Sequence, residues 1–236
     1  MKRPDDLLEH YCRTARPIQR KYMRANSCIG ATRLTCDYFG LLGIQAAPRP
    51  VKMVVTLPDS KLIYASGVTE EELATAGRRQ RYSFGDGATW NGHLVAIVEK
   101  RWLLDPSFDQ AVEVLGLARS EQRMLLIPLP ERFAENPDRF KLTVDGLDDR
   151  RRKLRIEYIE TRDDSYLETE AWTDDNLPKI LPEIARAMGT YSVGGDQETI
   201  TCHLCGTTSS RRQDIAQRYC VRCASFHHEP EMEVTA

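Results

Sequence analysis

Long hydrophobic runs are absent from this 236-residue chain. Every uninterrupted apolar stretch falls far short of the roughly 20 residues needed to cross a bilayer, so we expect no membrane partner. The first six residues hold two basic and two acidic side chains and no apolar core, which predicts that the chain has no signal peptide. Internal repeats are also absent, and the net charge is only −2. These absences favour one medium-sized domain with a small appendage.

Histidine and cysteine are scarce before residue 200, so the few that occur there are informative. Only His10 and His93 precede that point. Of the seven cysteines, four fall in two Cys-x-x-Cys pairs near the C-terminus. This spacing indicates metal binding more than a disulfide framework. Reduced thiols are typical of a reducing compartment, so we expect a cytoplasmic protein.

A cysteine at the predicted start of a helix is the first candidate site. Ser27 is a favourable N-cap residue. After Cys28, apolar residues recur at steps of three and four, as on a buried helical face, until Gly43, which is expected to end the helix. The unpaired amides and the helix dipole would favour the thiolate of Cys28, the nucleophilic form, and could hold an oxyanion. The alternative is a small buried core cysteine.

His93 and Asp105 are predicted to meet across a β-hairpin. His93 opens an apolar run that ends at Val98, and a second apolar run starts at Trp102 after three polar residues. If those three residues form the turn, Val98 pairs with Trp102, and Asp105 becomes a diagonal neighbour of His93 on the same face. A two-residue turn would place Asp105 on the other face. The alternatives are a structural core histidine and an aspartate that starts a turn.

Three segments together resemble the transglutaminase-like branch of the papain-like cysteine fold: SCIGATRLTCDYFGLLGIQAAP, GHLVAIV and RWLLDPS. The resemblance covers roughly residues 24–110. It implies an α+β fold with an antiparallel sheet and N-terminal helices. It also implies that Cys28 is the nucleophile, His93 the general base and Asp105 the acid that orients the imidazole.

The residues just before His93 are candidates for substrate contact. We assign Trp90 and Asn91 as substrate-binding residues. A glycine-containing loop at residues 85–87 leads into them. It could form a lid or a substrate wall, although a surface turn is the favoured interpretation.

The C-terminal segment predicts a structural zinc site. Its two pairs, Cys202 with Cys205 and Cys220 with Cys223, are separated by 14 residues, a spacing typical of a four-thiolate tetrahedral Zn²⁺ site. Four sulfur ligands leave no open position for catalysis. So short a segment cannot bury a core, so the metal is expected to supply folding free energy on the order of 10 kcal/mol. The segment resembles short zinc-ribbon modules at the ends of bacterial proteins.

These patterns predict four regions. The first is a transglutaminase-like domain over residues 1–190, followed by a linker over 191–200, a zinc ribbon over 201–228 and an acidic tail over 229–236. The ribbon carries four arginines and one aspartate, hence +3, and the tail carries three glutamates, hence −3. This juxtaposition favours docking of the ribbon to a protein or to the main domain over nucleic-acid binding.

Several further elements are predicted from periodicity. Residues 5–25 are expected to be helical, with Pro17 opening a second short helix. The papain-like resemblance offers Gln19 as an oxyanion donor, but its offset of nine residues from Cys28 fits poorly, so a solvent-facing side chain is the favoured interpretation. Strands are expected at residues 50–57, 142–144 and 154–159. A helix capped by residues 174–176 is expected to continue to Met188.

The leading functional hypothesis is a cysteine hydrolase or acyltransferase that forms a thioester at Cys28. The residues do not choose between water and an amine as acceptor, and the resemblance favours hydrolysis of a peptide, isopeptide or related amide bond. The expected partner is a peptide or protein substrate. The second hypothesis is a non-catalytic scaffold whose zinc ribbon binds a protein or a nucleic acid.

Overall fold

The structure is a computed structural model. It describes residues 4–23, 27–58, 62–69, 71–72, 79–80, 90–117, 124–131, 140–147, 150–188, 191–193, 198–202, 207–217, 219–222 and 225–226. The helical elements are α1 (Pro4–Tyr22), α2 (Cys28–Leu41), α4 (Asp109–Leu115), η1 (Asp164–Glu168), α6 (Glu170–Thr173), η2 (Leu177–Ile180), α7 (Leu181–Ala187) and α8 (Arg212–Gln217). The strands are β1 (Ala46–Thr56), β2 (Leu62–Ser66), β3 (Arg79–Gln80), β4 (His93–Val98), β5 (Trp102–Asp105), β6 (Leu125–Pro128), β7 (Lys141–Leu147), β8 (Lys153–Glu160), β9 (Tyr191–Val193), β10 (Ile200–Cys202), β11 (Thr208–Ser209), β12 (Tyr219–Cys220) and β13 (Ser225–Phe226).

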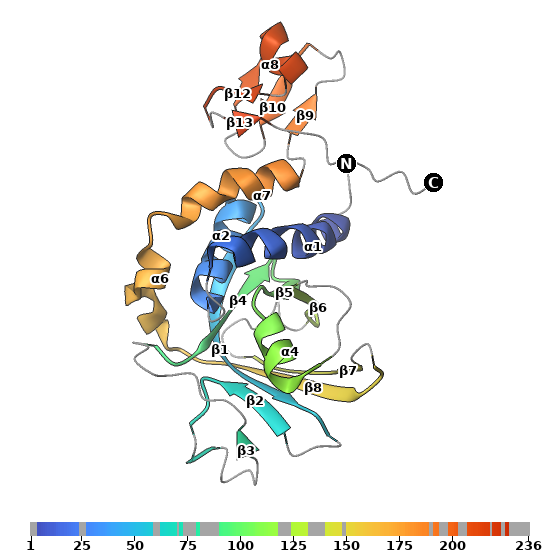
Figure 1. The fold of residues 1–236 in the computed structure, drawn as a ribbon, viewed down its shortest axis with the longest axis vertical. Helices are drawn as coiled ribbons and strands as arrows, with labels where there is room; N and C mark the ends of the chain where they lie inside the picture. Colours follow the sequence, from blue (N-terminus) through green and yellow to red (C-terminus); the bar gives the residue numbers. More distant parts are fainter. Residues whose placement is uncertain are drawn as a thin grey trace.

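The main part of the chain is an α+β structure built on a curled sheet (Figure 1). Across the described residues the sheet has eight strands in the order β3-β2-β1-β4-β5-β6, with β8 paired to β1 and β7 to β8. The pairs are antiparallel except for the short parallel pair of β2 with β3. The long strand β1 joins the parts of the sheet, because its first half pairs with β4 and its second half with both β2 and β8.

Both faces of β4 are covered, which explains its uninterrupted apolar sequence. Ala96 and Val98 belong to a core cluster with α1, α2 and α7. Val95 and Ile97 belong to a second cluster with α4 and the inner face of β8. All six residues of β4 are therefore buried.

The hairpin of β4 and β5 has the predicted register. Val98 pairs with Trp102, and the intervening turn is closed by a hydrogen bond of 3.0 Å from Arg101 N–H to the carbonyl of Val98. Glu99 and Lys100 adopt left-handed backbone conformations, with φ of 53° and 55°. The three-residue turn places Asp105 on the same face as His93, as expected from the sequence.

Helix α1 differs from its prediction, because it runs through Pro17 as one helix. Its buried side continues past the proline from Leu8 and Ala15 to Ile18 and Gln19. Packing on this continuous side offsets the hydrogen bond that a proline removes from a helix interior. Gln19 is fully buried, so its predicted exposure to solvent is also wrong.

The other predicted elements are confirmed with shifted limits. Strand β1 begins four residues before the expected start at residue 50, and β7 and β8 occur at the expected places. The helix expected to continue to Met188 is divided into η2 and α7. Pro182 explains the division, because a residue without an N–H is suited to the first turn of a new helix.

The C-terminal segment folds into small antiparallel sheets, β9-β10-β11 and β12-β13, and α8 connects β11 to β12 in chain order (Figure 1). The predicted linker over 191–200 is corrected at its start, because residues 191–193 form β9 and pair with β10. The aromatic and β-branched residues Tyr191 and Val193 suit such a strand. Residues 229–236 and the loop at 85–87 lie outside the described residues. Within the described part, no helix is long and apolar enough to cross a membrane.

Candidate active site and tail site

Cys28 is the first residue of helix α2 and is 9% exposed. The start of the helix is fixed to the sheet, because the Thr32 hydroxyl donates to the carbonyl of Leu94 over 2.8 Å. Thr32 lies one turn after Cys28, so this bond holds the start of α2 beside the strand that begins with His93. The helix ends at Leu41, just before Gly43, the residue expected to terminate it. Gly43 has a φ of +72°, and its N–H donates to the Gly40 carbonyl.

Ser27 occupies the N-cap position, but the predicted side-chain cap is absent among the described contacts. Its φ of −100° and ψ of 40° lie outside the extended conformation that aims a capping hydroxyl at the first-turn amides. The carbonyl of Ser27 does accept the N–H of Ala31 at 2.9 Å, so the helix starts where the sequence indicates. The first-turn amides thus receive no side-chain acceptor from Ser27, which leaves them open to another acceptor.

His93 and Asp105 form a buried pair, with Nε2 of the imidazole 2.8 Å from Oδ2 of the carboxylate. His93 is 1% exposed and Asp105 is fully buried. Cys28 lies close enough to His93 to act on the charge of its imidazole. Because Nε2 is committed to Asp105, Nδ1 is the ring nitrogen left for the thiol. The structure therefore brings the three predicted catalytic residues together.

The charges of the pair support each other. Burial disfavours the imidazolium form of His93, but the Asp105 carboxylate and the contact with Cys28 outweigh it and raise the pKa of His93 above its ordinary value. Burial likewise disfavours ionisation of Asp105, but His93, the Ser107 N–H and the Tyr158 hydroxyl hold the pKa of Asp105 below its ordinary value. The two buried groups therefore stabilise one another as an imidazolium and a carboxylate.

Two residues at the site were not predicted from the sequence. The Tyr158 hydroxyl donates to Oδ2 of Asp105 over 2.8 Å, and the Ser107 N–H donates to Oδ1 over 3.0 Å. The bond from the Ser107 N–H to the side chain two residues before it forms an Asx turn. The Asp-Pro-Ser sequence could have indicated this local pattern. No local signal identifies Tyr158, because it reaches Asp105 through pairing of β8 with β1.

Trp90 packs beside the predicted nucleophile. It shares a buried cluster with Cys28, Leu94 and Tyr166, and its ring centroid lies 5.7 Å from that of Tyr166 in an edge-on arrangement. Trp90 is 7% exposed, whereas Asn91 is exposed. The two predicted substrate contacts therefore differ, since Trp90 forms part of the wall behind Cys28 and Asn91 faces solvent.

Gly92 is required for this position of Trp90. A Cβ atom on Gly92 would lie 2.2 Å from Cζ2 of the Trp90 indole. We therefore expect Gly92→Ala to displace the indole and to lower the free energy of unfolding by about 1–3 kcal/mol, as other overpacked sites do. Chemical denaturation and tryptophan fluorescence measure the two effects.

The matched control for this change is Gly40→Ala. A Cβ on Gly40 meets no atom within 4 Å, and the residue lies in the last turn of α2. That variant should be unchanged or more stable by about 0.5–1 kcal/mol, because alanine costs less backbone entropy in a helix. Equal stability changes in the two variants would show that the contact with Trp90 is unimportant.

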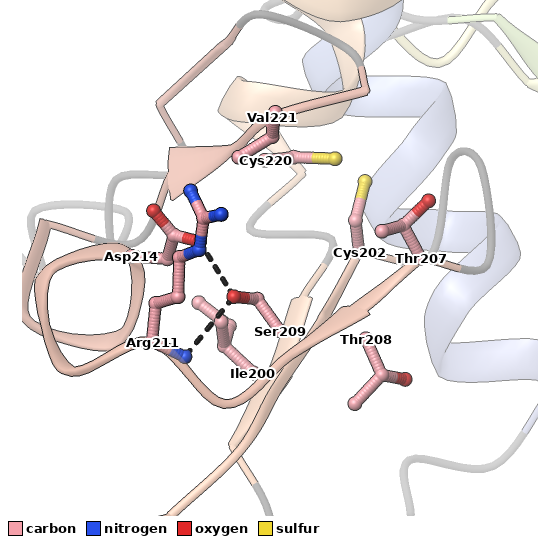
Figure 2. A pocket seen from close by; sticks show the side chains of 9 residues that line it. All are labelled: Ile200, Cys202, Thr207, Thr208, Ser209, Arg211, Asp214, Cys220 and Val221. Atoms are coloured by element: carbon pink, nitrogen blue, oxygen red, sulfur yellow. Dashed lines mark hydrogen bonds between the residues drawn. The ribbon is translucent and has the colours of Figure 1, made fainter.

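Two of the four predicted metal ligands lie in the described residues. Cys202 ends β10 and Cys220 ends β12, and both are buried. Both line a cavity of about 200 Å³. Figure 2 shows their sulfur atoms converging on one side of this cavity. Cys205 and Cys223 lie outside the described residues. Within the described part alone, no group of three histidine, cysteine or carboxylate side chains gathers as a metal site.

Polar contacts fix the wall opposite the two thiols. The Ser209 hydroxyl donates to Oδ2 of Asp214 over 2.5 Å, and the Arg211 N–H donates to the Ser209 oxygen over 3.2 Å (Figure 2). Asp214 is 6% exposed and lies in the first turn of the short helix α8. This bonding holds the turn before α8 beside the strand that carries Cys202.

Comparisons with known proteins add no further constraint, because no family model, curated protein or solved structure matches this chain.

Proposed function

We propose that the protein is a cysteine hydrolase or acyltransferase of the transglutaminase-like, papain-type class, and that its nucleophile is Cys28. One observation carries this proposal: the buried 2.8 Å bond between His93 and Asp105, with the imidazole in contact with a thiol at the head of α2. A nucleophile, a base and a third group that orients the base are the set that acyl transfer through cysteine requires.

The first half of the reaction follows from these positions. The Cys28 thiolate attacks the carbonyl carbon of an amide, and the carbonyl electron pair moves to oxygen. First-turn amides of α2 stabilise that oxyanion. As the carbon–nitrogen bond breaks, His93 gives a proton from Nδ1 to the departing nitrogen. The amine leaves, and a thioester remains on Cys28.

The second half returns the enzyme to its starting state. Neutral His93 takes a proton from water, or from an acceptor amine, as its oxygen or nitrogen attacks the thioester carbonyl. Collapse of the second tetrahedral intermediate breaks the carbon–sulfur bond and releases the Cys28 thiolate. Hydrolysis of a peptide, isopeptide or related amide is our preferred reaction. Trp90, and Asn91 beside it, would contact the substrate.

Trapping of the acyl-enzyme tests the proposed function. The protein is incubated with p-nitrophenyl acetate, and its intact mass is followed with time. One acetyl group should appear on wild-type protein, map to Cys28 and be absent from Cys28→Ala. If wild-type protein acquires no acetyl group on Cys28, the scaffold hypothesis replaces the enzyme hypothesis.

We also propose that Cys202, Cys205, Cys220 and Cys223 hold one structural Zn²⁺. The facing sulfurs of Cys202 and Cys220 suit the soft thiolate set that zinc favours. Bound zinc would stabilise the tail, with no part in the acyl transfer. These two cysteines also lie in the core cluster of α1 and α7, so the tail would dock on the main domain. A four-thiolate site favours a reducing compartment such as the cytoplasm.

Elemental analysis of purified protein should find about one zinc per chain. In Cys202→Ser we expect almost none, because a neutral hydroxyl is a poor replacement for a thiolate ligand. Cys36→Ser removes a cysteine from α2 and should keep the metal. A wild-type protein that binds no zinc, or a Cys202→Ser variant that keeps it, would exclude the site.

A further inference from the structure

The carboxylate of Asp105 is held by several donors at once. Oδ2 accepts the Nε2–H of His93 and the hydroxyl of Tyr158, each at 2.8 Å. Oδ1 accepts the N–H of Ser107 at 3.0 Å, and the Ser107 hydroxyl lies at 3.4 Å. Because Asp105 is fully buried, these protein groups replace the water that would otherwise solvate its charge. Among them, Tyr158 contacts the same oxygen atom as the catalytic imidazole.

The sheet fixes Tyr158 in this place. Tyr158 is opposite Met53 in the pairing of β8 with β1, and His93 is opposite Val51 in the pairing of β4 with β1. Residues 51 and 53 of one strand point to the same face. Tyr158 and His93 therefore lie on the two strands that flank β1, with their side chains on the same face of the sheet, and both reach Asp105. Tyr158 is fully buried, so its ring has no room to turn the hydroxyl away.

We propose that Tyr158 is a positioning residue of the active site, which orients the Asp105 carboxylate and withdraws part of its negative charge from His93. This proposal rests on the proposed function. A donor on Oδ2 makes that oxygen a weaker partner for the imidazolium. His93 then releases its proton to the leaving group more readily than it would beside an unshared carboxylate.

The neighbouring ionisable groups do not replace Tyr158. Cys28 acts on the charge of His93 from α2, and Nδ1 is the ring nitrogen that is not bonded to Asp105. Tyr64 approaches from β2, and its pKa is raised by burial and by the charges of Cys28, Asp105 and Asp109. Tyr64 is therefore neutral at working pH. Asp109, from α4, is paired with Arg16.

The test replaces Tyr158 by phenylalanine, which keeps the ring and removes the hydroxyl. Titration of His93 is followed by NMR of ¹³C-labelled histidine, with the signal assigned by its loss in His93→Ala. Because Asp105 regains its full charge, the titration midpoint of His93 should move upward by about 0.5 pH unit or more. The rate of acetylation at Cys28 should fall several-fold at neutral pH. Tyr38 belongs to the core cluster of α1, α2 and α7, so Tyr38→Phe should leave the titration midpoint of His93 unchanged.

An unchanged or lowered His93 midpoint in Tyr158→Phe would overturn the proposal and leave Tyr158 as a core residue. If that variant does not fold, 3-fluorotyrosine at position 158 supplies the same test with the opposite sign, because a more acidic phenol is a stronger donor and should lower the midpoint. Failure of the proposed function is a separate result. It would be seen in wild-type protein as the absence of an acetyl group on Cys28, whereas the His93 titration needs no substrate.

Discussion

Alkylation of Cys28 by iodoacetamide should slow by roughly 30-fold at pH 7 when His93 is replaced by alanine. The proposed function requires the His93 imidazolium, held by Asp105, to stand beside a Cys28 thiolate at neutral pH. An unpaired cysteine has a pKa of about 8.5, so only a few per cent of it is thiolate at pH 7. The difference should shrink as the pH rises and nearly vanish above pH 9.5 or so, where an unpaired thiol also ionises. The pH dependence therefore distinguishes a lost ion pair from a lost fold.

The sequence makes this measurement specific. Arg24 and Arg33 flank Cys28, so trypsin releases it in a peptide with no other cysteine. Cys36 falls in the next peptide and is an internal control, because burial raises its pKa to about 12 and it should not react near neutral pH in either protein. His10→Ala controls for loss of a histidine elsewhere. Equal rates at Cys28 in wild type and His93→Ala at pH 7 would contradict the ion pair.

Asp109→Ala should lower the free energy of unfolding by about 3–5 kcal/mol, because it leaves a buried cation without its partner. Asp109 accepts two bonds from Arg16, of 3.0 and 2.6 Å, and one from Arg20 of 3.1 Å. The Arg16 side chain is only 3% exposed. These bonds also hold the start of α4 against α1, four residues after Asp105. Urea denaturation gives the change in free energy.

Two controls separate the buried charge from the loss of a salt bridge as such. Asp145→Ala breaks an exposed pair with Arg155, whose side chains are 66% and 51% exposed, and should cost less than about 1 kcal/mol. The double variant Arg16→Met with Asp109→Leu removes both charges and should recover much of the stability lost in Asp109→Ala. If Asp109→Ala lowered the free energy of unfolding as little as Asp145→Ala, Arg16 would have found another partner or reached water.

The sequence predicts the parts of the site that depend on local geometry. The register of the β4–β5 hairpin follows from three polar residues between two apolar runs, and it brings Asp105 to His93. The head of α2 follows from helical periodicity ending at Gly43. Tyr158 and the Arg16–Asp109 pair could not be predicted, because they depend on contacts between segments 53 and 93 residues apart.

Two wrong predictions have the same physical origin. Pro17 was expected to divide α1, and Gln19 to face solvent, because each residue has that preference when considered alone. In the fold, α1 buries a continuous side against the rest of the core, and this packing outweighs the preferences of both residues. Local sequence preferences therefore predicted where the helices and strands form. Tertiary packing determined where they end and which of their side chains are buried.

The pairing of β8 with β1 has a consequence for synthesis of the chain. Cys28, His93 and Asp105 have all been translated by residue 105, yet Tyr158 follows 53 residues later. Until β8 has left the ribosome, one side of β1 lacks its strand and the Asp105 carboxylate lacks one of its donors. A nascent chain therefore carries the three residues of the proposed triad before their environment is complete. Under the proposed function, full reactivity would be acquired only after β8 has been made and has paired with β1.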